Sequence, residues 1–332
     1  MTRPRSPVNA LRSPDASASA FLPRQSLTAV PVRPPALHPG DPVAVVAPAS
    51  PPRTLDAYER GLAALRRLYD VRFAWAPGAE RGYLAAPDAD RADALHAAVR
   101  APEVRALFCV RGGYGTLRLL NRIRWPLVRR RPTLLIGYSD ITALQMALYA
   151  RAGWTSLSGP VVTEWAQADE ETIGHVRQLA EGHCPPLASD LTALRPGTAR
   201  GPLLGGNLSV LSRLVGTPYA PRFRGSILCL EDVAEAPYRV DRMLAHLQHA
   251  GILRAVNGVV LGAFSTGPDS SSPSLSLEEV FRDYLADRPY PVATGLSYGH
   301  LLPRRTLPLG GRVTLEATSE GGTLTLSSPI VR

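Results

Sequence analysis

Short hydrophobic runs alternate with amphipathic stretches along the first half of the chain. The runs, which predict β-strands, span residues 42–48, 71–75, 106–110 and 133–139. The stretches with apolar residues at helical spacing span residues 54–69, 90–99, 117–123 and 140–151, with Asp88 as a possible N-cap of the second. Strands that alternate with helices form a parallel sheet covered on both faces. We therefore predict an α/β domain for residues 38–165.

The hydrophobic pattern changes toward the C-terminal half of the chain. A helix is predicted for residues 170–181, and the proline-containing stretch after it completes a connector of residues 166–199. Beyond the connector, short apolar runs interrupted by Gly and Pro predict strands at 225–232, 258–264 and 312–317, with one clear helix at 238–250. This pattern predicts a smaller β-rich, barrel-like domain at residues 200–332.

The first 37 residues differ in composition from the rest of the chain. Residues 1–37 are rich in Pro, Ser, Ala and Arg without sustained periodicity, which predicts a disordered extension. The chain carries a formal charge of +9 and no lysine, and nearly half of the excess lies in this extension. Nucleic-acid binding requires a concentrated basic surface. We therefore expect no nucleic-acid partner.

The three cysteines (Cys109, Cys184 and Cys229) lie far apart. Cys109 and Cys229 lie inside apolar runs, where cysteine usually behaves as a small buried hydrophobe. The spacing fits neither a disulfide framework nor a zinc site, so we expect no metal and a reducing, cytoplasmic location. No apolar stretch approaches the roughly 18 residues of a membrane span, and no continuous apolar segment follows the N-terminal arginines. The sequence therefore predicts neither a membrane association nor a secretory signal.

A serine occupies the end of the fourth predicted strand, where ligands collect in α/β sheets. Ser139 lies in the segment LLIGYSDIT, on a sharp turn from strand to helix. Such a turn presents the hydroxyl outward, while the Asp140 N–H supplies half of an oxyanion hole. The alternative is that Ser139 or Asp140 caps the helix, since both residue types are favoured there. Residue 141 is Ile, so the G-x-S-x-G motif is only half present.

A glycine-rich segment, RGGYG at residues 111–115, follows the third predicted strand. It matches neither G-x-G-x-x-G nor a phosphate-binding loop with its lysine. Its glycines permit close approach of the backbone, so the amide of Gly113 or Gly112 is a candidate second oxyanion donor. A plain tight turn is the alternative.

A serine nucleophile needs a base, and the base needs an orienting acid. His300 follows a short apolar segment and a glycine, which makes it the best base among seven histidines. The others lie in predicted helices, in the first turn of the ordered chain or in the connector. Glu231 directly follows the apolar run ILCL and is the candidate acid, with Asp232 as its nearest competitor.

Together these segments resemble the LD-carboxypeptidase family of serine peptidases, which includes muramoyltetrapeptide carboxypeptidases. The matching segments occur in the family's order from about His38 to the C-terminus and read CVRGGYGTLRLL, LIGYSDITAL, GGNLSVL, LCLEDVAEAPYRVDRML and SYGHLLPRRTLPLGG. The resemblance implies a nucleophile at Ser139, a base at His300 and an acid at Glu231. It also implies a flavodoxin-like N-terminal domain with a parallel sheet, a β-rich C-terminal domain, and an active site in the cleft between them.

The resemblance further implies the reaction and the partners. The expected activity is hydrolysis of the amide that joins an L-centre of a diamino acid to the terminal D-alanine of a murein tetrapeptide. We expect a small peptide substrate, no cofactor, and a homodimer. Arg111 is a candidate for holding the terminal carboxylate, with an ordinary ion pair as the alternative. Further candidate substrate contacts, for which packing or helix capping are alternatives, are Asn207, Tyr238 and Arg239.

Two alternative functions are compatible with the same fold, and one segment departs from the family pattern. A self-immunity peptidase that cleaves microcin C-type aminoacyl nucleotide analogues would use an aromatic residue to stack on the base. Trp165 is the candidate, with ordinary packing as the alternative. A non-catalytic binding module is disfavoured because all three triad residue types are present. Arg304 and Arg305 stand where relatives often have uncharged polar residues, which puts the details of the substrate in question.

Overall fold

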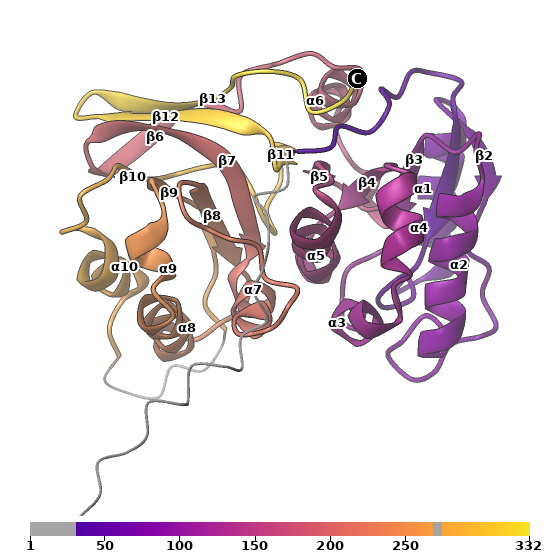
Figure 1. The fold of residues 1–332 in the computed structure, drawn as a ribbon, viewed down its shortest axis with the longest axis horizontal. Coiled ribbons are helices and arrows are strands. Elements are labelled where there is room, and N and C mark those ends of the chain that lie inside the picture. The colour runs from indigo at the N-terminus through magenta and orange to yellow at the C-terminus, as the bar shows by residue number, and fades with distance from the viewer. Residues whose placement is uncertain (1–30, 268–273) are drawn as a thin grey trace, which may run out of the picture.

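The computed structural model describes residues 31–267 and 274–332. These residues form a layered α/β domain and a closed β-barrel that lie side by side (Figure 1). This arrangement confirms the predicted fold class.

The N-terminal domain is built on a six-stranded sheet in the order β11-β5-β4-β3-β1-β2. Its strands are β1 (Pro42–Val46), β2 (Asp70–Phe73), β3 (Ala106–Cys109), β4 (Leu134–Gly137), β5 (Ser156–Ser158) and β11 (Leu307–Leu309). The first five pair in parallel, and their order 2-1-3-4-5 is the flavodoxin-like one. Every residue of β3 and β4 is buried, as expected of strands covered on both faces.

The helices of this domain follow the strands closely. They are α1 (Leu55–Arg66), α2 (Asp88–Arg100), α3 (Thr116–Leu119), α4 (Trp125–Arg130) and α5 (Thr142–Ala152), with short 3-10 turns η1 (Leu120–Arg122), η2 (Ser139–Ile141) and η3 (Val162–Glu164). Two details differ from the prediction. Asp88 is the first helical residue of α2 rather than its N-cap, and its carboxylate pairs with Arg91 and Arg118. The helix predicted at 117–123 is divided into α3 and η1.

The C-terminal domain is a closed barrel in the order β10-β6-β13-β12-β7-β8-β9. Its strands are β6 (Ala188–Arg195), β7 (Gly197–Asn207), β8 (Ile227–Asp232), β9 (Gly258–Phe264), β10 (Val292–Thr294), β12 (Arg312–Thr318) and β13 (Gly321–Leu326). The helices after residue 165 are α6 (Glu170–Ala180), α7 (Leu208–Leu214), α8 (Pro237–His249), α9 (Ile252–Ala255) and α10 (Leu277–Leu285). Helix α7 of this domain contacts α5 of the first.

The predicted connector of residues 166–199 contains α6 as expected, but it is not a linker at its C-terminal end. Strand β6 and the start of β7 lie there, and both are barrel strands. Only Leu191 of β6 is fully buried, so this strand has no apolar run from which it could be predicted. The predicted C-terminal domain of residues 200–332 also differs in one strand. Strand β11 belongs to this part of the chain but pairs antiparallel with β5 in the sheet of the N-terminal domain.

The predicted extension of residues 1–37 is too long at its C-terminal end. Residues 1–30 lie outside the described residues, but residues 31–37 are packed on the N-terminal domain. Val32 forms a β-bridge with Trp154, and Leu37 is fully buried. The Ala36 N–H donates to the carbonyl of Arg332 at 2.8 Å. These partners are distant in sequence, so local periodicity does not reveal them.

The cysteines match the prediction for their surroundings. All three are free, and Cys109 and Cys229 are buried. In the part of the chain that the structure describes, no helix has the length and apolar character needed to cross a bilayer.

Candidate active site

Ser139 lies on a strained turn between β4 and α5. Its φ is +66°, a left-handed conformation that is uncommon for residues other than glycine. Neither η2 nor α5 has a side-chain cap hydrogen bond, so the alternative that Ser139 or Asp140 caps the helix is wrong. Strain of this kind persists only where the surrounding structure fixes it, and it is common at functional sites.

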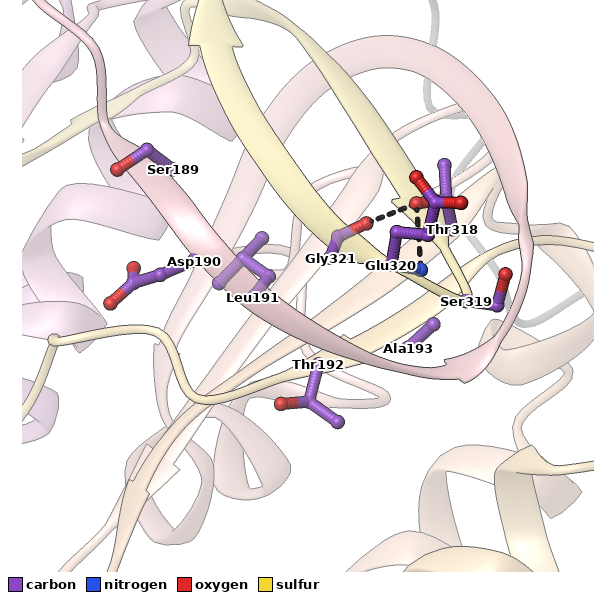
Figure 2. Close-up of a pocket in the computed structure, with 9 residues that line it drawn as sticks. All are labelled: Ser189, Asp190, Leu191, Thr192, Ala193, Thr318, Ser319, Glu320 and Gly321. Atoms are coloured by element: carbon purple, nitrogen blue, oxygen red, sulfur yellow. Dashed lines mark hydrogen bonds between the residues drawn. The ribbon is translucent and has the colours of Figure 1, made fainter.

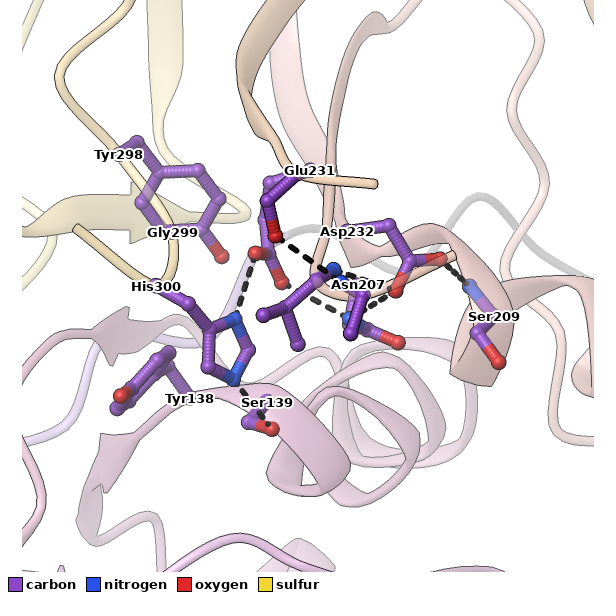
Figure 3. A network of polar contacts seen from close by, with 12 residues as sticks. Tyr138, Ser139, Asn207, Ser209, Glu231, Asp232, Tyr298, Gly299 and His300 are labelled. Atoms are coloured by element: carbon purple, nitrogen blue, oxygen red, sulfur yellow. Dashed lines mark hydrogen bonds and ion pairs between the residues drawn. The ribbon is translucent and has the colours of Figure 1, made fainter. Parts of the chain in front are cut away.

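Ser139, His300 and Glu231 form one chain of hydrogen bonds across the two domains (Figure 3). His300 Nε2 lies 3.1 Å from Ser139 Oγ, and His300 Nδ1 lies 2.9 Å from Glu231 Oε2. The Glu231 side chain is fully buried at the end of β8, whereas the His300 side chain is 23% exposed. The structure therefore brings together three side chains that the sequence places at the ends of separate apolar runs.

Asn207 and Gly299 hold the Glu231 carboxylate in place. Asn207 Nδ2 donates to Glu231 Oε1 at 3.1 Å and to Asp232 Oδ1 at 3.0 Å. A Cβ at Gly299, where φ is +115°, would lie 2.6 Å from Glu231 Oε2, so only glycine lets the histidine loop pass this close. Asn207 is itself buried and is the N-cap of α7. It acts on Glu231, and its predicted contact with substrate is not supported by its partners.

Asp232, the competing acid, faces away from His300. Its carboxylate accepts the N–H groups of Ser209 at 2.8 Å and Val233 at 2.9 Å. Burial, together with the neighbouring Glu231, raises the pKa of Asp232 to about 6. The described geometry therefore selects Glu231 as the partner of the histidine.

The RGGYG loop passes directly against Ser139. A Cβ at Gly112 would lie 2.8 Å from Ser139 Cβ and 3.1 Å from its Oγ, so this position requires glycine. Among the described residues, the N–H groups of Gly113 and Asp140 donate to no protein acceptor. Both N–H groups therefore remain candidate oxyanion donors.

Ser50 and Thr116 fix this loop, and sequence reasoning missed both. Ser50 N–H donates to the Gly112 carbonyl at 3.1 Å, and Ser50 Oγ accepts the N–H of Tyr114 at 3.0 Å. The Asp140 carboxylate accepts the N–H of Thr116 at 2.8 Å and also the Thr116 hydroxyl. Burial raises the pKa of Asp140, and the Thr116 hydrogen bonds oppose that shift. The position of Ser50 just after the first apolar run is the sequence signal by which it could have been found.

The other predicted substrate contacts are Arg111, Tyr238 and Arg239, and their hydrogen-bond partners differ. Arg111 donates to the Pro51 carbonyl at 3.0 Å and has no ion-pair partner among the described residues, which removes the structural ion pair as an alternative. Arg239 donates to the Tyr238 hydroxyl at 3.1 Å and pairs with Glu235. Tyr238 and Arg239 make no hydrogen bond to Ser139, Glu231 or His300 within the described part of the chain.

Trp165, Arg304 and Arg305 are engaged in packing and ion pairs. Trp165 is 3% exposed, and its ring packs against Phe108 with centroids 5.3 Å apart. The alternative of ordinary packing is therefore the right one for Trp165. Arg304 is buried against Glu164, and Arg305 pairs with Glu171 at 2.7 Å. Both arginines form ion pairs within the protein. These contacts do not support the predicted influence of the two residues on the choice of substrate.

A separate pocket lies on the barrel and shares no residue with this site (Figure 2). Residues 189–193 of β6 and residues 318–321 at the β12–β13 turn line it, and the Thr318 hydroxyl donates to the Gly321 carbonyl at 2.6 Å. Within residues 31–267 and 274–332, no group of three His, Cys, Asp or Glu side chains is placed to hold a metal ion.

A serine on a strained turn, a histidine paired with a buried carboxylate, and two unengaged amides form the arrangement that serine hydrolases use. The chain belongs to the LD-carboxypeptidase family. Residues 43–159 match the N-terminal domain of LD-carboxypeptidases, and residues 200–315 match the C-terminal domain.

Relatives and solved structures agree with this membership. The chain is 37% identical over 298 residues to the probable murein peptide carboxypeptidase of Bacillus subtilis strain 168, covering 87% of this chain and 92% of the relative. It is 34% identical over 292 residues to the murein tetrapeptide carboxypeptidase of Pseudomonas aeruginosa, covering 82% and 92%. The muramoyltetrapeptide carboxypeptidase of Oxalobacter formigenes superposes with a TM-score of 0.76 at 30% identity, covering 86% of this chain and 98% of that one.

Structures of MccF and of an MccF-like protein also share the fold. An MccF-like protein from Bacillus anthracis superposes with a TM-score of 0.79 at 25% identity, covering 89% of this chain and 99% of that one. The microcin C7 self-immunity protein MccF superposes with a TM-score of 0.80 at 20% identity, covering 90% and 99%. At this identity the second likeness shows the fold alone.

Proposed function

We propose that this protein is a serine carboxypeptidase that hydrolyses the L,D-amide bond to the terminal D-alanine of murein tetrapeptides. The observation that carries the proposal is the hydrogen-bonded order Ser139, His300, Glu231, with the serine in one domain and its partners in the other. The murein peptide activities named for the relatives supply the substrate class.

The geometry supports an acyl-enzyme mechanism. Ser139 Oγ attacks the carbonyl carbon of the scissile amide while His300 Nε2, 3.1 Å away, takes the hydroxyl proton. Glu231 holds the Nδ1–H tautomer of His300 and stabilises the imidazolium. His300 then gives the proton to the amine of the leaving D-alanine, and the C–N bond breaks. A water molecule, deprotonated by His300, hydrolyses the ester and releases Ser139.

The unengaged amides of Gly113 and Asp140 bind the oxyanion in both tetrahedral intermediates. Losing one such donor typically costs about 2.7–4 kcal/mol of transition-state stabilisation. The Asp140 carboxylate accepts a hydrogen bond from the N–H of Thr116. The side chain of Asp140 therefore fixes the loop, while its backbone N–H is the proposed oxyanion donor.

Arg111 is our candidate for binding the terminal carboxylate of the substrate. It lies in the same loop as Gly113, and its guanidinium has no acidic partner among the described residues. An arginine fork matches a carboxylate in geometry and charge. Tyr238, whose side chain is exposed, and Arg239 remain predicted contacts at the surface of α8.

We also propose that the protein is cytoplasmic and forms a homodimer. A cytoplasmic location is supported by three cysteines that are all free. A homodimer rests on the family resemblance.

The self-immunity function is the second candidate because the MccF-like protein superposes with a TM-score of 0.79. The burial of Trp165 weighs against it, since this was the aromatic residue that the sequence offered for stacking on a nucleotide base. Murein tetrapeptide is therefore the favoured substrate.

The test is to measure D-alanine release from a murein tetrapeptide by wild type, Ser139→Ala and His300→Ala. Each variant is expected to lower kcat by about 10³-fold or more, because the members of a triad act as a unit. A fluorophosphonate should label wild type but not Ser139→Ala. Ser319→Ala, at the exposed β12–β13 turn, is the matched control and should keep full activity.

Full activity in Ser139→Ala or His300→Ala would contradict the catalytic roles. A higher kcat/KM for an aminoacyl sulfamoyl adenosine than for the tetrapeptide would instead favour the self-immunity function. A wild-type protein that neither turns over a substrate nor reacts with the label would be a binding module.

A further inference from the structure

The aromatic ring of Tyr138 lies between the two halves of the proposed active site. Tyr138 directly precedes Ser139, and its ring centroid lies 5.0 Å from that of His300 (Figure 3). The guanidinium carbon of Arg304 lies 4.1 Å from the same ring centroid. Tyr138 therefore contacts both His300 and Arg304, which lies four positions after that histidine.

Arg304 and Tyr138 are joined a second time through Glu164. The Tyr138 hydroxyl donates to Glu164 Oε1 at 2.6 Å, and Arg304 forms an ion pair with Glu164 Oε2. Arg304 also donates to the carbonyl of Gly299 at 3.2 Å, directly before the histidine. Glu164 is held in turn by the N–H of Val161 at 3.2 Å. These contacts close a ring of interactions around Tyr138.

The Arg304 side chain is buried within this ring of interactions. It is 3% exposed, and a guanidinium leaves water at a large cost unless it is paired and hydrogen-bonded. Burial and the nearby Glu164 carboxylate raise the pKa of the Tyr138 hydroxyl, which therefore stays protonated and donates.

A triad divided between two domains needs a device that sets the distance between its halves. A misplacement of about 1 Å can cost about 100-fold in rate. We propose that Arg304, Tyr138 and Glu164 form a positioning clamp that fixes the His300 loop on the Ser139 turn. Arg304 is the positioning residue of this clamp and touches neither substrate nor the reacting atoms. This inference rests on the proposed function, since it concerns the same serine and histidine.

The test compares Arg304→Gln with Arg305→Gln. Arg305 is the matched control because it is the next residue and also pairs with an acid, Glu171, but at the surface. Arg304→Gln is expected to lower kcat and the rate of acylation by a fluorophosphonate by about 10- to 100-fold, with KM changed less than about twofold. Arg305→Gln should keep both rates. Arg304→Lys, which keeps the charge but not the planar stacking on Tyr138, should recover part of the loss.

A merely structural Arg304 would give a different result. In that case Arg304→Gln would lower the thermal midpoint but keep wild-type kcat and acylation rate at 25 °C, which would overturn the proposal. If Arg304→Gln does not fold, Tyr138→Phe is measured instead, because it keeps the ring but removes the hydroxyl that bonds Glu164. Unchanged rates in this variant would again overturn the proposal. A failure of the proposed function is recognised separately, because wild type itself would then neither release D-alanine nor react with the label.

Discussion

The backbone of Ser139, the proposed nucleophile, has an unfavourable conformation. Its φ is +66°, and its Oγ lies 3.1 Å from His300 Nε2. For a residue with a Cβ, the left-handed conformation costs roughly 1–2 kcal/mol. The close approach of Gly112 on one side and the Asp140–Thr116 contact on the other hold the turn in this state.

This strain predicts different stabilities for two substitutions that remove the Ser139 hydroxyl. Ser139→Gly relieves the left-handed conformation, whereas Ser139→Ala keeps it, so the glycine variant is expected to be about 1 kcal/mol more stable than the alanine variant. Urea unfolding of the two variants measures the difference. An alanine variant as stable as the glycine variant would show that the turn is not strained.

At the scale of secondary structure, α6 packs on the segment that carries β11. His175 of this helix is buried, and its Nδ1 accepts the N–H of Thr306 at 3.1 Å. Burial, with a contribution from Arg305, lowers the pKa of His175 to about 4. The neutral imidazole is therefore part of the folded state.

This shift predicts a loss of stability in mild acid. The unfolded chain binds a proton at His175 near pH 6.5 and the folded chain only near pH 4, so stability is lost as the pH falls between these values. From pH 7 to pH 5 the free energy of unfolding should fall by about 2 kcal/mol through this group. His175→Asn, which keeps an acceptor for Thr306, should remove that part of the dependence.

Urea unfolding at both pH values measures the effect for wild type and variant. His183, whose side chain is 67% exposed, provides the control, because His183→Asn should leave the pH dependence unchanged. Equal pH dependence in wild type and His175→Asn would contradict the prediction.

At the scale of the whole molecule, segments from the C-terminal half of the chain join the N-terminal domain. Strand β11 crosses from the C-terminal half into the N-terminal sheet, and the final residues pack beside residues 31–37. The Thr155 hydroxyl donates to the carbonyl of Ile330 at 2.7 Å, and Ile330 itself is 1% exposed. A second hydrogen bond of 2.7 Å joins Ser158 of β5 to the buried Tyr298. Separate unfolding of one domain would break these contacts.

We therefore expect both domains to unfold in one transition. Ile330→Ala should lower the free energy of unfolding by about 2–5 kcal/mol, as large-to-small core substitutions do. Tryptophan fluorescence and loss of activity should still shift together along the urea axis. Thr325→Ala, at an exposed position of β13, is the control. Two separated transitions in Ile330→Ala would show that the domains unfold independently.

The alternation of hydrophobic runs and amphipathic stretches predicted the parallel sheet and its first four strands, and it predicted the barrel-like second domain with three of its seven strands. It did not reveal strands β5, β6, β7, β10, β11 and β13, of which β6 has one fully buried residue, or the helices α4, α7, α9 and α10. The types of residue at the ends of apolar runs also singled out Ser139, Glu231 and His300. These features are local, because side-chain periodicity and the turn after a strand depend on neighbouring residues.

Only the tertiary structure decided which polar groups face each other. Asn207 was predicted to touch substrate, but its amide joins two buried carboxylates. Arg304 stood out as a departure in the pattern, and its partner Glu164 lies 140 positions away. Glu231 and Asp232 are equivalent by type and neighbours in sequence, yet only Glu231 contacts His300. A charged or polar side chain acquires its function from the groups that burial places opposite it, and the chain folds those groups together from distant positions.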